Sequence, residues 1–135
     1  MIFDEAMDRL LAYNRRRYWL TNGWCIRFRV RRCPISHARP HGIRYAFTLH
    51  DVQMVRLLGF DNAHGIPRRQ AYDHRHRFRG PGKPVPYDFT GGDDLICDFF
   101  GEVERACRLE GVPFSFDADE TELEHEADDD DEIVA

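Results

Sequence analysis

The stretch that decides the fold class of this 135-residue chain is Trp24-Cys25-Ile26-Arg27-Phe28-Arg29-Val30-Arg31-Arg32-Cys33. Apolar and basic side chains alternate along it with the two-residue period of a β-strand. One face is formed by Trp24, Ile26, Phe28 and Val30, and the other by Arg27, Arg29 and Arg31. The pattern predicts a strand that buries one face and presents a ladder of guanidinium groups on the other.

The segments around this stretch predict how the sheet continues. Residues 42–50 and 54–60 have strand-like composition and are joined by a short turn, which favours an antiparallel meander, and 74–78 is a short strand candidate. Apolar residues at helical spacing predict an N-terminal helix over 3–13 and a C-terminal helix over 93–110. We therefore expect an α+β fold, with a small antiparallel sheet of three to five strands and both helices packed on it.

Charge is distributed unevenly along the chain. Residues 1–90 contain 17 basic and 7 acidic residues, whereas residues 91–135 contain 2 basic and 17 acidic residues. Of the 19 basic residues, 18 are arginine, the side chain that binds planar oxyanions through two parallel hydrogen bonds. Residues 117–132 contain 11 acids and no Lys or Arg, a composition typical of disorder in an isolated chain. We expect one domain over 1–114 and an acidic, disordered tail over 115–135.

Several protein classes are excluded by composition. The longest apolar runs fall far short of the roughly 20 residues that a membrane span requires, so we expect no membrane association. The N-terminus has no basic region before an apolar stretch, which argues against a signal peptide. The four cysteines form no Cys-x-x-Cys pair, and we interpret them as free thiols. These features predict a cytoplasmic protein.

Segment 60–79 concentrates the side chains suited to chemistry. If residues 74–78 are extended, His74 and His76 lie on one face, and Arg75 and Arg77 lie on the other. Histidines can act as general acid and base near neutral pH, and arginine stabilises phosphoryl transition states. We therefore predict metal-independent RNA cleavage without a cofactor, with the 2′-hydroxyl as nucleophile. The predicted catalytic residues are Asp61, Asn62, His64, His74 and His76, and the predicted substrate-binding residues are Arg27, Arg29, Arg44, Arg75 and Arg77.

Other interpretations of the same residues stay open. The three histidines of this segment, together with Asp61, could instead converge on a divalent metal. The arginines are also compatible with a solvated strand face, and Asp61-Asn62 is compatible with simple turn chemistry. The alternative function is a non-catalytic module that binds nucleic acid or protein. The acidic tail is either a solubility element or a nucleic-acid mimic that folds back over the arginines.

Six short motifs follow one another between residues 44 and 100. They are Arg44-Tyr45, Leu49-His50-Asp51, Gly59-Phe60-Asp61-Asn62-Ala63-His64, Tyr72-Asp73-His74-Arg75-His76, Val85-Pro86-Tyr87 and Leu95-Ile96-Cys97-Asp98-Phe99-Phe100. This series resembles the TumE-like toxin family, whose members often have Tyr where Phe60 stands here. The resemblance implies the toxin of a type II toxin–antitoxin pair, with a helix-turn-helix antitoxin as its partner. It implies no particular catalytic mechanism, and a homo-oligomer is compatible with it.

Overall fold

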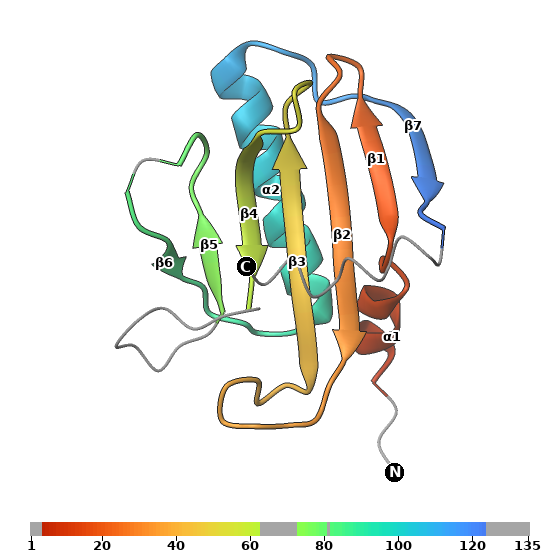
Figure 1. Ribbon diagram of the computed structural model, residues 1–135, viewed down its shortest axis with the longest axis vertical. Helices are drawn as coiled ribbons and strands as arrows, with labels where there is room; N and C mark the ends of the chain where they lie inside the picture. The colour runs from red at the N-terminus through yellow and green to blue at the C-terminus, as the bar shows by residue number, and fades with distance from the viewer. Residues whose placement is uncertain (1–3, 63–72, 81, 124–135) are drawn as a thin grey trace.

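Seven strands form one antiparallel sheet in the part of the chain that the structure describes. The structure is a computed structural model, and it describes residues 4–62, 73–80 and 82–123. The strands are β1 (Arg16–Leu20), β2 (Cys25–Arg32), β3 (Ile43–His50), β4 (Arg56–Asp61), β5 (His74–His76), β6 (Val85–Pro86) and β7 (Phe116–Thr121). They lie in the order β6-β5-β4-β3-β2-β1-β7 (Figure 1). The helices are α1 (Glu5–Leu11) and α2 (Gly92–Glu110).

The predicted α+β class agrees with the structure, but the predicted count of three to five strands is wrong. β1 begins with two consecutive arginines, so it lacks the alternation of apolar and polar residues from which a strand is recognised. Arg16 and Arg17 lie on opposite faces of the sheet, and each pairs with an acidic residue of β7. β7 lies in the segment for which we predicted disorder, and all six of its residues are exposed. Strands at the rim of a sheet have little apolar surface to bury, so they lack the pattern from which strands are recognised.

The core lies between the sheet and α2. Phe99 of α2 packs against Phe28, Phe47 and Phe60, with ring centroids 5.5, 5.7 and 5.7 Å away. The predicted inward residues of the 24–33 strand are all buried, namely Trp24, Ile26, Phe28 and Val30. Figure 1 shows α2 running behind the central strands. The sheet therefore has one face covered by a helix and a second face that carries the alternate set of side chains.

The two helices differ in length and in how they agree with the predicted ranges. α1 is shorter than predicted: Asp4 caps its first turn by accepting a hydrogen bond from the Met7 N–H, and the helix ends at Leu11. α2 agrees closely with its predicted range and ends at Gly111, whose φ of 77° is left-handed. Within the described residues, neither helix combines the length and the hydropathy needed to cross a membrane.

Candidate functional site

Cross-strand neighbours bring predicted histidines and arginines to the sheet face opposite α2. Residues directly opposite one another in antiparallel strands project from the same face. From β2 to β5, one row consists of Arg29, Ala46, Asp61 and His74, and the next consists of Arg27, Thr48, Gly59 and His76. Phe28, Phe47 and Phe60 alternate with these residues and contact α2, so both rows face away from that helix. We call this surface the Arg/His face, defined by Arg27, Arg29, Asp61, His74 and His76.

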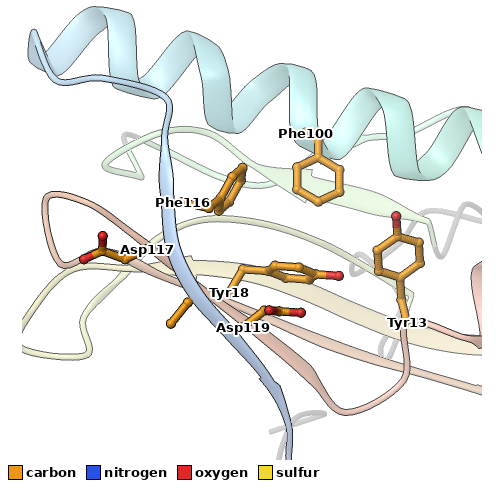
Figure 2. A pocket seen from close by; sticks show the side chains of 7 residues that line it. Tyr13, Tyr18, Phe100, Phe116, Asp117 and Asp119 are labelled. Atoms are coloured by element: carbon orange, nitrogen blue, oxygen red, sulfur yellow. The ribbon is translucent and has the colours of Figure 1, made fainter.

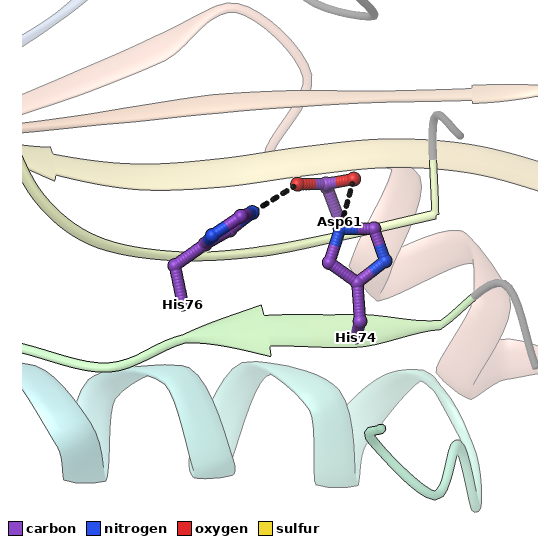
Figure 3. Close-up of side chains that lie close together, drawn as sticks. All are labelled: Asp61, His74 and His76. Atoms are coloured by element: carbon purple, nitrogen blue, oxygen red, sulfur yellow. Dashed lines mark ion pairs between the residues drawn. The ribbon is translucent and has the colours of Figure 1, made fainter. Parts of the chain in front are cut away.

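Asp61 connects the two histidines on the β4–β5 side of this face (Figure 3). Its Oδ1 lies 3.1 Å from His74 Nε2, and its Oδ2 lies 3.5 Å from His76 Nε2. The His74 side chain is 5% exposed and the His76 side chain 21%. A carboxylate within reach of an imidazole nitrogen fixes the orientation of the ring. His74 is therefore held in the interior of the cluster, whereas His76 is the more accessible of the two.

The same three side chains have the donor set of a metal site. Asp61, His74 and His76 each offer one ligand atom, and these atoms all lie within 4.8 Å of one another. Imidazole and carboxylate together suit zinc, manganese or iron. A metal ligand must be deprotonated, so a bound metal and a protonated imidazole exclude each other at the same nitrogen. The cluster can therefore perform acid–base chemistry or hold a metal. Adding a metal chelator distinguishes these two possibilities, because it would abolish only an activity that depends on a metal.

Asn62 joins the backbones of β3 and β4 next to this cluster. Its Oδ1 accepts a hydrogen bond of 2.9 Å from the Tyr45 N–H, and its Nδ2 donates one of 2.9 Å to the Ile43 carbonyl. The residue is 1% exposed. These bonds engage both ends of the side-chain amide with backbone. Asn62 is thus placed to position Asp61, its neighbour in the chain, rather than to contact a substrate.

Arg27 and Arg29 lie against Glu122, the residue that follows β7. Arg27 Nε and Nη2 lie 3.2 and 3.4 Å from the two carboxylate oxygens, and Arg29 Nη2 also contacts this carboxylate. Burial raises the pKa of Glu122, but the hydrogen bonds from Arg29 and Arg27 outweigh burial, and the pKa is lowered overall. Two arginines predicted to bind phosphate therefore bind a carboxylate of their own chain.

The remaining predicted site residues do not all lie on the Arg/His face. Arg44 is on β3, and strand alternation places it on the same side as the Arg/His face. Arg75 points the opposite way, with its Nη1 3.6 Å from Glu102 Oε1 on α2. Arg77 follows β5 and is exposed, and His64 lies outside the described residues. Arg75 thus stands apart from His74 and His76, as the alternation within 74–78 predicts.

Two polar residues on this side of the sheet were not predicted as site residues. The His50 ring Nε2 lies 2.8 Å from Thr48 Oγ1, and burial lowers the pKa of His50. The two-residue alternation of β3 could have identified it. Glu122 gives no local signal, because Arg29 and Arg27 precede it by 93 and 95 residues.

Comparison with family models matches most of the chain. A family model described as toxin TumE matches residues 11–107. The matched region contains all residues that define the Arg/His face, and it ends before β7 and Glu122. Neither the curated proteins nor the solved structures include a match to this chain. The family match thus covers the histidine cluster and the arginines, but not the carboxylate that lies against them.

Proposed function

The chain belongs to the TumE toxin family, and from this premise we propose that it is the toxin of a toxin–antitoxin pair and cleaves RNA on the Arg/His face. One observation carries the RNA assignment: arginines and a histidine–aspartate cluster lie in two adjacent cross-strand rows. RNA cleavage needs cations that bind the phosphate and groups that move protons. This face supplies both sets of side chains.

The middle of the Arg/His face supports this assignment. Three strand spacings, roughly 14 Å between backbones, separate β2 from β5. The positions between them carry Ala46, Thr48 and Gly59. A Cβ at Gly59 would lie 3.2 Å from the Phe47 carbonyl oxygen, so a larger residue there would require this backbone to shift by a few tenths of an ångström. The middle of the face thus carries small side chains between the arginines and the histidines, and in this proposal the phosphodiester spans these positions.

The proposed reaction needs no metal. Arg27 and Arg29 bind the phosphate, and His76, the more exposed histidine, accepts the proton of the 2′-hydroxyl. The 2′-oxygen then attacks phosphorus, and the bond from phosphorus to the 5′-oxygen breaks. His74 in its protonated form donates a proton to the leaving oxygen, and Asp61 orients both imidazoles. The products are a 2′,3′-cyclic phosphate and a 5′-hydroxyl, with no net change in protons.

The proposed partner is a helix-turn-helix antitoxin encoded by the adjacent gene. The expected result is that co-expression of the adjacent gene product restores growth that the toxin alone arrests. Growth arrest that persists in the presence of every adjacent gene product would contradict the pairing.

The test of the reaction is induced expression followed by examination of total RNA. The wild type should arrest growth and cleave RNA, and His76→Gln should reduce the cleavage rate by about 10²-fold or more, the usual contribution of a general base. His37→Ala is the matched control, because His37 is exposed in the loop between β2 and β3. The control should behave as the wild type does.

Two outcomes would overturn parts of the proposal. Growth arrest with intact RNA in wild type and His76→Gln alike would refute ribonuclease activity and favour a non-catalytic binding module. Cleavage by the purified protein should persist in excess EDTA. Loss of cleavage in EDTA, with recovery on addition of Zn²⁺ or Mn²⁺, would replace the metal-independent reaction by metal chemistry at Asp61, His74 and His76.

A further inference from the structure

Two imidazoles and one carboxylate converge on the Arg/His face at the spacing of metal ligands. His74 and His76 turn their Nε2 atoms to the two carboxylate oxygens of Asp61, at 3.1 and 3.5 Å (Figure 3). Ligand atoms that lie about 2.0–2.1 Å from a tetrahedral zinc ion are separated from one another by roughly 3.3–3.4 Å. The two nitrogen–oxygen distances therefore bracket the spacing that a tetrahedral ion imposes.

The placement of the two imidazole rings agrees with the same geometry. Their centroids lie 5.2 Å apart, and their planes are inclined by 78°. A ring centroid lies roughly 1.1 Å from the ring nitrogen, and hence about 3.2 Å from a metal on that nitrogen, so two rings on one tetrahedral ion have centroids roughly 5.2 Å apart. The three ligand atoms already lie within 4.8 Å of one another. Small side-chain movements therefore suffice to bring them onto one ion.

Backbone pairing holds these ligands on regular strands. Asp61 of β4 lies directly opposite His74 of β5, and His76 lies opposite Gly59. The side chains of Asp61 and His74 are 14% and 5% exposed, so solvent screens the cluster only in part, whereas His76 is the side at which an ion can enter. A ligand set that is ordered before binding loses less conformational entropy when it binds.

A cavity elsewhere in the described structure offers carboxylates without imidazole. It lies on the α2 side of β7, has a volume of about 410 Å³ and carries Asp117 and Asp119 (Figure 2). None of its described lining residues is a histidine or a cysteine, and Asp119 pairs with Arg16. Imidazole suits zinc, whereas carboxylates by themselves suit magnesium or calcium. The cavity therefore serves as a comparison for the cluster of Asp61, His74 and His76.

We propose that Asp61, His74 and His76 bind one divalent transition-metal ion of the zinc class, and that the bound ion switches off cleavage. The second part rests on the proposed function, because it concerns the two histidines that move protons in that reaction. An imidazole that binds a metal through Nε2 carries its one proton on Nδ1, so neither nitrogen has a lone pair left to accept a proton. Metal occupancy and proton transfer by His76 therefore exclude each other.

Titration of the purified full chain with Zn²⁺ alone, without RNA, tests the metal site. Calorimetry should show binding of one ion, and His76→Gln and Asp61→Asn should each weaken the affinity by about tenfold or more. His37→Gln makes the same exchange at an exposed loop histidine, and Asp117→Asn removes a carboxylate from the cavity beside β7. Both controls should bind Zn²⁺ as the wild type does. Equal affinities of the cluster variants and their controls would overturn the metal site.

A second measurement uses the unmutated protein and so does not depend on the folding of any variant. X-ray absorption of the zinc-loaded chain should show nitrogen and oxygen ligands that include two imidazoles. A ligand shell without imidazole would also overturn the metal site.

RNA cleavage with and without the ion tests the switch. Saturating Zn²⁺ should slow cleavage by about tenfold or more, since proton transfer contributes about 10²-fold or more, and EDTA should restore the rate. Mg²⁺ is the matched control and should have no effect, because it prefers oxygen ligands. Faster cleavage with Zn²⁺ would refute the switch and replace the metal-independent reaction. Absence of cleavage under every condition would refute the proposed function and the switch together, whereas the metal site is decided by the binding measurements.

Discussion

Replacement of Asn62 by alanine should destabilise the fold strongly, although the change removes few atoms. The side chain satisfies the Tyr45 N–H and the Ile43 carbonyl, and these two residues are 1% and 0% exposed. A buried polar group left without a partner costs about 1–3 kcal/mol, so two such groups cost about 2–6 kcal/mol. This is a large part of the roughly 5–15 kcal/mol that stabilises a typical domain. At roughly 4 °C per kcal/mol, the melting temperature should fall by roughly 8–24 °C.

Thermal unfolding followed by circular dichroism measures this change, and Asn22→Ala is its control. Asn22 Oδ1 accepts one hydrogen bond of 3.1 Å from the Trp24 N–H in a partly exposed turn, so its loss should cost only about 0.5–1.5 kcal/mol. If the Asn62→Ala and Asn22→Ala proteins had the same melting temperature, the role of Asn62 in positioning Asp61 would be refuted. If the Asn62→Ala protein also lost RNA cleavage while remaining stable, Asn62 would have to act on the substrate directly.

Two further predictions concern packing and pH. Gly92→Ala places a Cβ 2.7 Å from the Ala6 carbonyl oxygen and should destabilise the protein by about 1–3 kcal/mol. Gly101→Ala, whose Cβ would have no atom of the described residues within 4 Å, should instead stabilise α2 by about 0.5–1 kcal/mol. Chemical denaturation measures both free energies of unfolding, and changes of the same sign would contradict the contact between α1 and α2. The folded-state pKa of Glu122 is below its ordinary value of 4.5, so its contribution is present above that pH and is lost as pH falls through the lower folded-state value. The difference in stability between wild type and Glu122→Gln, measured from pH 2 to 7, should shrink on acidification, and a constant difference would show that the charge of Glu122 is irrelevant to stability.

The elements with an apolar face could be predicted from the sequence. The alternation of 24–33 identifies the buried set that includes Phe28, and helical spacing over 93–110 identifies Phe99 as a core residue of α2. Both patterns arise because each element buries one face against the same core. The prediction that His74 and His76 share a face follows from the same strand geometry, and their common contact with Asp61 agrees with it.

The rim of the sheet could not be predicted in this way. β1 pairs with β2 on one side and with β7 on the other, and the side-chain contacts between β1 and β7 include the ion pairs Arg16–Asp119 and Arg17–Glu120. These two segments are about a hundred residues apart in the chain, with separations of 103 for both ion pairs. Local composition predicts that β7 is an acidic, solvated segment, and only its pairing with β1, far away in the chain, places it in the sheet.

The sequence by itself determined the α+β class, the inner strands, α2 and the chemical character of the two halves of the chain, because hydrophobic periodicity and charge are properties of neighbouring residues. The tertiary structure decided which distant side chains meet. It placed His74, His76 and Asp61 in register with Arg27 and Arg29, and it placed Glu122 against these two arginines. Strand order and register set these contacts, and both depend on the packing of the whole sheet against α2.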